Sequence, residues 1–115
     1  MGVVHLAHDA LLDRPVAIKV MGREIGEDPE ARELFLHEAR AMAALNHPGI
    51  VTLHDAGVEG ATPFLVMEHL RGRPLRELLI PGAPFLPERT ILRYGAQVAD
   101  ALTAVHAKRL SSIAT

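Results

Sequence analysis

Two opposite charges stand where the surrounding pattern predicts burial, and they are the residues best placed to do chemistry. Residues 16–21 read as a strand, in which Lys19 has apolar neighbours on its own face. Glu38 falls within an apolar helical stripe in the segment that follows, at positions 31, 34, 35, 38, 42 and 45. Leaving one such charge buried and unpaired costs about 3–5 kcal/mol. We therefore expect one Lys19–Glu38 ion pair. A solvated Lys19, with Glu38 at the edge of the stripe, is the alternative.

The elements that must position these charges follow from the same pattern. Short apolar runs predict strands at residues 3–8, 16–21, 50–56 and 64–68, with a loop at 22–27 and a turn at 57–63. Asp28 and Pro29 suit the start of a helix, which ends at the turn of residues 46–49. A short helix over 74–79 and a long helix from 87 to about 108 complete the chain. This order predicts an α+β fold, with an antiparallel sheet packed on one long helix.

Composition narrows the classes of function. The chain has 115 residues, a formal net charge of -2 and no cysteine. Nucleic-acid binding calls for a basic surface, which this balance argues against, and thiolate metal sites and disulfides need cysteine. No apolar run approaches the roughly 18 residues that span a bilayer, so we expect a cytoplasmic protein without a membrane segment. The histidines show no ligand spacing, because His5 and His8 point to opposite faces of a strand, and no metal site is expected.

Residues 16–19 read Val-Ala-Ile-Lys, a strand signature of protein kinases. Residues 1–7 resemble the end of the glycine-rich loop with the strand after it, and Glu38 stands where the glutamate of the family's C-helix falls. Residues 46–51 resemble the loop after that helix, residues 64–68 the strand that leads into the hinge, and residues 87–106 the first long helix of the C-terminal lobe. The chain, from residue 1 to about 109, resembles a bacterial-type serine/threonine protein kinase domain.

The resemblance implies two parts. Residues 1–70 would form the sheet, C-helix and hinge of the N-terminal lobe, with the first strand of the family missing. Residues 71–115 would begin the C-terminal lobe, and residues 111–115 do not match the family pattern.

The resemblance also assigns residues to the phosphates of ATP. Lys19 would hold the α and β phosphates, with Glu38 orienting it. Gly2 would be the last glycine of the loop that covers the phosphates, where a missing side chain lets backbone N–H groups approach. The intact family also uses Mg²⁺.

A second group of residues is assigned to the adenine ring by the same resemblance. Val4 and Ala17 would form an apolar roof over the ring, and Met67 would stand at the gatekeeper position. The Glu68 carbonyl and the Leu70 N–H would bond the adenine edge through the backbone. Ordinary core packing is the alternative role for Val4, Ala17 and Met67.

The sequence departs from the family in ways that bear on activity. The first two glycines of the loop are missing, and His-Arg-Asp and Asp-Phe-Gly do not occur in these 115 residues. The catalytic aspartate and the magnesium ligands of the family are thus missing, and phosphoryl transfer rests almost wholly on such positioning groups. We expect a chain with ATP-binding elements but without phosphotransfer to protein substrates on its own.

Two alternatives remain open. The chain could be a non-catalytic, pseudokinase-like interaction fragment, which self-associates through the apolar face of the helix over 87–108. It could also be a truncated or frameshifted gene product.

Overall fold

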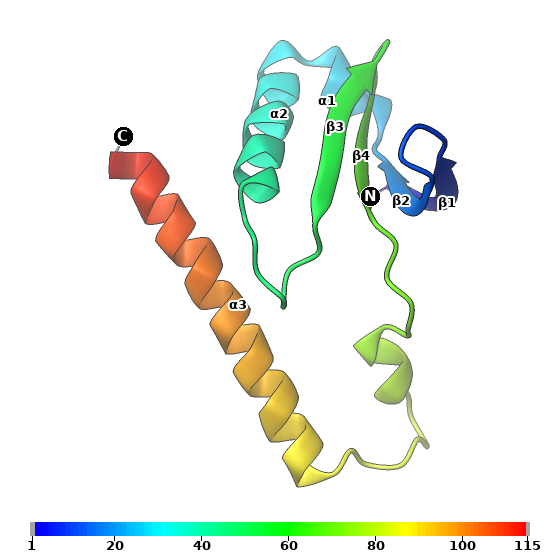
Figure 1. The fold of residues 1–115 in the computed structure, drawn as a ribbon, viewed down its shortest axis with the longest axis vertical. Helices are drawn as coiled ribbons and strands as arrows, with labels where there is room; N and C mark the ends of the chain where they lie inside the picture. The colour runs from blue at the N-terminus through cyan, green and yellow to red at the C-terminus, as the bar shows by residue number, and fades with distance from the viewer. Residues whose placement is uncertain (1, 115) are drawn as a thin grey trace. The chain divides into compact units, whose positions relative to one another are not determined.

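The computed structural model describes the backbone of residues 2–114 and the side chains of residues 2–108. The chain divides into two compact units, Met1–His69 and Leu70–Thr115. The first unit carries the sheet and two helices, and the second carries a short 3-10 helix and one long helix (Figure 1). In chain order the elements are β1 Val3–Asp9, β2 Arg14–Val20, α1 Arg23–Glu27, α2 Pro29–Ala43, β3 Leu53–Glu59, β4 Thr62–Glu68, η1 Leu75–Leu78 and α3 Glu88–Ala114.

The first unit is built on a four-stranded antiparallel sheet in the order β1-β2-β4-β3. The β3–β4 ladder carries an irregularity between Leu53 and Asp55. Helix α2 contacts β3, and the short helix α1 contacts both α2 and β4 (Figure 1). The predicted α+β fold is confirmed.

The β1–β2 connection is organised by one carboxylate. Asp9 accepts the backbone N–H groups of Leu11 at 3.1 Å and Leu12 at 3.2 Å, and it also pairs with Arg14. The Leu12 hydrogen bond, helped by Leu11 and Arg14, lowers the pKa of Asp9 below its ordinary value, although partial desolvation acts in the opposite direction. Asp13 completes the turn with a positive φ of 51°. The ionised form of Asp9 therefore holds this turn.

Helix α2 begins as the sequence predicts. The Asp28 carboxylate accepts the Glu30 N–H at 3.2 Å, and Pro29 occupies the first turn, where no intrahelical N–H is needed. The helix buries Ala39 beside a small core that includes Val16, Leu53 and Pro63. The core is aliphatic, as expected from a chain with few aromatic residues.

Some predicted boundaries are wrong. The segment 22–27 is not a loop but contains α1, which ends beside the buried Gly26. The turn predicted over 57–63 is much shorter, because β3 continues to Glu59 and β4 starts at Thr62. Gly60, with φ of 63°, supplies the tight reversal between them. The last helix continues to Ala114 rather than ending near Lys108.

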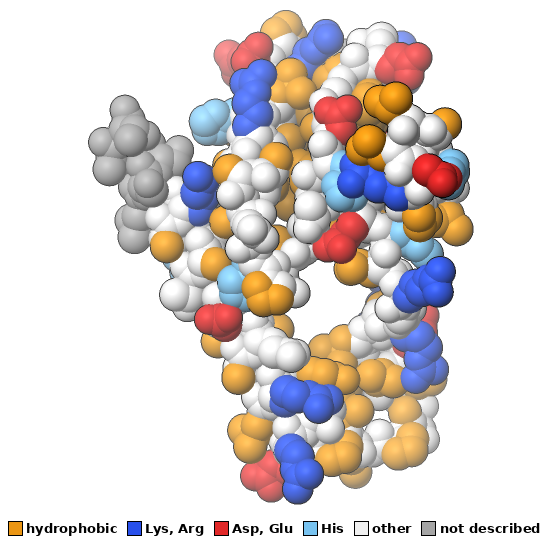
Figure 2. All heavy atoms as spheres, in the orientation of Figure 1, with side chains coloured by type: hydrophobic (Ala, Val, Ile, Leu, Met, Phe, Trp, Pro, Cys, Tyr) orange, Lys and Arg blue, Asp and Glu red, His pale blue; other side chains and the backbone are white. Residues whose placement is uncertain are grey.

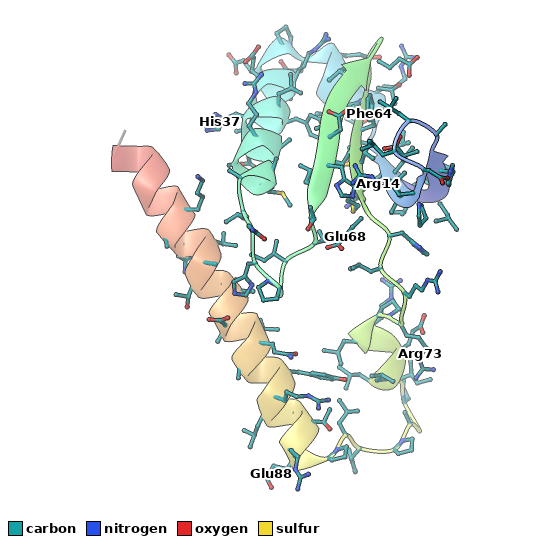
Figure 3. All side chains as sticks on the ribbon, viewed as in Figure 1. Arg14, His37, Phe64, Glu68, Arg73 and Glu88 are labelled. Carbon is teal, nitrogen blue, oxygen red and sulfur yellow. The ribbon has the colours of Figure 1, made fainter. Side chains whose placement is uncertain are left out.

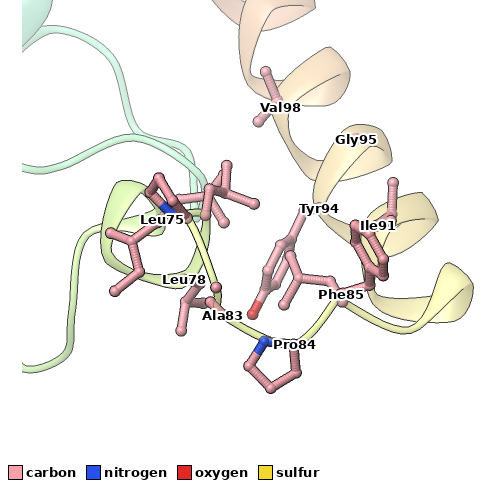
Figure 4. A pocket seen from close by; sticks show the side chains of 14 residues that line it. Leu75, Leu78, Ala83, Pro84, Phe85, Ile91, Tyr94, Gly95 and Val98 are labelled. Carbon is pink, nitrogen blue, oxygen red and sulfur yellow. The ribbon is translucent and has the colours of Figure 1, made fainter.

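The second unit holds an apolar cavity of about 840 Å³ between its own elements. Leucines of the η1 turn, the segment of residues 79–86 and one side of α3 line it, with Tyr94 reaching in from the helix (Figure 4). Among the residues that the structure describes, no helix combines the length and the apolar character needed to cross a membrane.

Candidate functional site

Strand register places most of the predicted site on one face of the sheet. Ala17 lies opposite Met67 of β4, and Lys19 lies opposite Val4 of β1. Directly paired residues of antiparallel strands project to the same side. We call this side the Lys19 face; from β1, β2 and β4 it includes Val4, Leu6, Ala17, Lys19, Leu65 and Met67. Four residues that the sequence assigned separately are thus brought together.

The Lys19 face is apolar around a single cation. Val4 and Leu6 are largely exposed, at 60% and 68%, whereas Ala17, Lys19 and Met67 are half-buried. Within residues 2–108, Lys19 takes part in no ion pair. An apolar surface with one unneutralised ammonium group suits a ligand that has a flat apolar part and an anionic part.

The opposite face of the same strands has a different character. It comprises Val16, Ile18, Val20, Phe64 and Val66, which alternate with the residues of the Lys19 face. A shallow hollow of about 400 Å³ lies there, lined by Ile18, Val20, Phe64, Glu59 and Thr62. The described residues that line this hollow include no cation, and the carboxylate of Glu59 disfavours an anionic ligand there.

Gly2 lies against the Lys19 face. A Cβ atom at this position would stand 2.5 Å from the Val20 carbonyl oxygen and 3.2 Å from the Lys19 Cγ. Real side chains do not approach a backbone oxygen so closely, so the position accepts only glycine without movement. The resemblance assigned Gly2 to a close backbone approach, and here the residue is adjacent to Lys19.

The expected environment of Glu38 is wrong. Its side chain is exposed on α2, and no ion pair joins it to Lys19 within residues 2–108. The side of α2 that faces inward carries the buried Ala39 and the half-buried Phe35. One residue of offset turns a side chain by about 100° around a helix, which separates Glu38 from Ala39. His37 also points away from the sheet (Figure 3). The role of Glu38 beside Lys19 stays a prediction.

Glu68 has a function that sequence reasoning missed. Only its backbone was assigned a role, yet its carboxylate Oε1 accepts the Thr52 N–H at 2.8 Å, and its own N–H donates to the Thr52 carbonyl at 2.9 Å. Figure 3 shows Glu68 where β4 ends, beside the chain that enters β3. Nothing in the local pattern of residues 64–68 signals a partner sixteen positions away.

Two further members of the Lys19 face were also missed. Leu6 follows Val4 by two positions and Leu65 precedes Met67 by two, so strand alternation could have identified both. Leu70, the remaining predicted contact, is exposed at the start of the second unit. Across the described side chains, no group of three His, Asp or Glu residues is close enough to hold a metal ion.

Comparison with known proteins identifies the family. The family model for the protein kinase domain matches residues 1–111. The chain is 38% identical over 117 residues to the serine/threonine-protein kinase PksC of Streptomyces coelicolor. The aligned region covers 98% of this chain and 20% of that protein. It is 39% identical over 110 residues to the serine/threonine-protein kinase PknB of Mycobacterium tuberculosis, covering 92% of this chain and 17% of that protein.

Solved structures agree with the sequence relatives. The kinase domain of Mycobacterium tuberculosis PknI superposes with a TM-score of 0.81 at 28% sequence identity, covering 94% of this chain and 44% of that one. The chain therefore spans less than half of a solved kinase domain and a fifth or less of the two relatives above. These matches show that the chain belongs to the protein kinase domain family, as part of a bacterial-type serine/threonine kinase domain.

Proposed function

We propose that this chain is the nucleotide-binding part of a serine/threonine protein kinase and that it binds ATP on the Lys19 face. The adenine ring would lie against Val4, Ala17 and Met67, and Lys19 would hold the phosphates. The observation that carries the proposal is the strand register, because it places Val4, Ala17 and Met67 on the same face as Lys19, which has no ion-pair partner within residues 2–108. Gly2 adds support, since only a residue without a side chain fits beside Lys19.

ATP and Mg²⁺ differ in how well they fit the chain. The apolar side chains of the Lys19 face suit the adenine ring, and the ammonium group of Lys19 suits the phosphates of an adenine nucleotide. Mg²⁺ at a nucleotide site is usually held by one or two carboxylates together with phosphates and water, and the family's carboxylate ligands belong to motifs that do not occur in these 115 residues. We therefore assign no magnesium site to these residues.

Phosphotransfer by this chain alone is not part of the proposed function. The family places its catalytic aspartate and metal ligands in motifs that do not occur in these 115 residues. An intact kinase domain would use ATP to phosphorylate serine or threonine in a protein substrate, and we propose a cytoplasmic setting because ATP is supplied there.

Calorimetric titration of the full chain with ADP and with a non-hydrolysable ATP analogue tests the proposal. Saturable binding of both nucleotides is expected, together with weaker binding of adenosine, which has no phosphate for Lys19. A folded chain, as judged by circular dichroism, that gives no heat with either nucleotide at millimolar concentration contradicts the proposal.

A second candidate function is self-association through the second unit. The cavity of this unit is lined by apolar side chains, and several of them are strongly exposed, including Phe85 at 101%, Ile91 at 55% and Val98 at 57%. Figure 2 shows hydrophobic side chains gathered on the surface of this unit. Exposed apolar patches of this kind mark interaction surfaces.

Substitutions on α3 test the self-association. The double variant Ile91→Gln/Val98→Gln is expected to weaken association about tenfold or more in sedimentation velocity, because both residues line the cavity. Leu92→Gln is the matched control: Leu92 is 65% exposed on the same helix and does not line the cavity. A wild-type chain that stays monomeric at high concentration, or an equal loss in both variants, counts against this candidate.

A further inference from the structure

The hydrogen bonds between Thr52 and Glu68 depart from a regular antiparallel pair. In such a pair, two facing residues exchange both backbone hydrogen bonds, N–H to C=O in each direction. The first of these bonds is normal, since the Glu68 N–H donates to the Thr52 carbonyl at 2.9 Å. The return bond is not, because the Thr52 N–H donates to the Glu68 carboxylate Oε1 at 2.8 Å. The side chain has taken the place of the Glu68 backbone carbonyl.

This exchange occurs where the ladder between β3 and β4 is about to stop. Leu53 pairs with Met67, one position before, and β4 ends at Glu68. The N–H and C=O of one strand residue point to the same side, so the Glu68 carbonyl would otherwise accept the Thr52 N–H. No backbone bond from the Thr52 N–H to that carbonyl is present in this described part of the chain. Because the Glu68 carboxylate accepts the Thr52 N–H, the Glu68 backbone carbonyl receives no hydrogen bond from Thr52.

The exchange is also energetically favourable. A hydrogen bond from a backbone N–H to an ionised carboxylate is stronger than one to a neutral carbonyl. The Thr52 N–H therefore favours the carboxylate over the carbonyl, and the end of β4 stays attached to the chain that enters β3 through both bonds.

We propose that Glu68 is a positioning residue for adenine: its carboxylate takes the Thr52 N–H, so that the 6-amino group meets the Glu68 backbone carbonyl, which has two lone pairs, without a second donor competing for it. This inference rests on the proposed nucleotide site, which assigns the Glu68 carbonyl to the adenine edge. It adds a reason for a glutamate at this position: an acceptor side chain is required, although the side chain itself does not touch the ligand.

Two substitutions separate this role from a purely structural one. Glu68→Ala removes the competing acceptor, and the Thr52 N–H then returns to the backbone carbonyl. Glu68→Gln is a graded variant: its amide oxygen can still accept the Thr52 N–H, but without the charge it loses its advantage over the backbone carbonyl. Calorimetry of the full-length chain with ADP and with inosine diphosphate, which has no 6-amino group, reports on the carbonyl directly.

The expected result is a change in discrimination between the two nucleotides. Glu68→Ala is expected to bind ADP about tenfold more weakly and to bind inosine diphosphate with little change. Glu68→Gln is expected to bind ADP with an affinity between those of the wild type and Glu68→Ala, and to bind inosine diphosphate about as well as the wild type does. A merely structural loss lowers both affinities equally. An unchanged ratio in Glu68→Ala, or a loss in Glu68→Gln as large as in Glu68→Ala, overturns the inference.

A measurement without nucleotide tests the hydrogen bonding of Glu68 separately from nucleotide binding. Scalar coupling across a hydrogen bond, measured by NMR between the Thr52 nitrogen and the carbonyl carbon of position 68, is expected to be absent in the wild type and present in Glu68→Ala. Coupling already present in the wild type overturns the inference even if ADP binds. A wild-type chain that shows no coupling and binds neither nucleotide contradicts the proposed function, and the proposed role in adenine binding is overturned with it.

Discussion

Replacing Gly26 with alanine is expected to destabilise the first unit by about 1–3 kcal/mol. Gly26 is buried in α1, and a Cβ atom added there would overlap the backbone carbonyl of Ala61, in the turn just before β4. The Cβ position is fixed by the helix backbone and Ala61 contributes main-chain atoms, so neither can move aside as the end of a flexible side chain could. Alanine favours a helix over glycine by up to about 1 kcal/mol, and the clash has to exceed this gain. Urea denaturation followed by circular dichroism measures the change.

Gly95 provides the matched control for that substitution. It lies exposed in α3, and a Cβ atom there would have nothing within 4 Å. Gly95→Ala is expected to leave stability unchanged or to raise it by up to about 1 kcal/mol, since only helix propensity changes. If Gly26→Ala is as stable as the wild type, the close approach of α1 to β4 is contradicted.

Replacing Lys19 with alanine is expected to weaken ADP binding by about 10- to 100-fold, which corresponds to the loss of a hydrogen bond between charged groups. Adenosine should bind the variant about as well as it binds the wild type, because it has no phosphate. Calorimetric titration of the wild type and of Lys19→Ala with both ligands gives the ratio of wild-type to variant affinity for ADP and for adenosine.

Arg23→Ala removes the same formal charge from the first unit at a different place. Arg23 is 72% exposed in α1, where it pairs with Glu27, and it is not a member of the Lys19 face. This control variant should bind ADP within about twofold of the wild type. Equal losses in the two variants would mean that net charge, rather than the position of Lys19, governs binding.

The strand and helix pattern could be predicted from sequence because local signals agree there. Asp28 and Pro29 mark the start of α2 by capping chemistry, and the alternation of residues 16–21 places Ala17 and Lys19 on one face. Resemblance to kinases then identified Val4 and Met67 as their neighbours, and the register brings them to the same face. The helix start and the strand alternation depend on residues that are close together in the sequence, and the positions of Val4 and Met67 follow from the kinase resemblance.

The misses depend on tertiary contacts. Gly26 suggested a loop, but it is a glycine because α1 has to approach Ala61 closely. Glu38 appeared buried because apolar residues cover a wide arc of α2, and only packing decides which part of that arc faces the core. The carboxylate of Glu68 depends on Thr52, which a distant part of the chain supplies. No local periodicity encodes such pairings.

The claim that nucleotide binds on the Lys19 face is tested most directly by methyl NMR of the full chain during titration with ADP. The two faces of the sheet carry alternating methyl-bearing residues, so each face reports separately on the ligand. The account predicts saturable shifts confined to the Lys19 face, at Val4, Leu6, Ala17, Leu65 and Met67, with small changes at Val16, Ile18, Val20 and Val66. Saturable shifts centred on the opposite face, or no shift on either face at millimolar ADP, would contradict it.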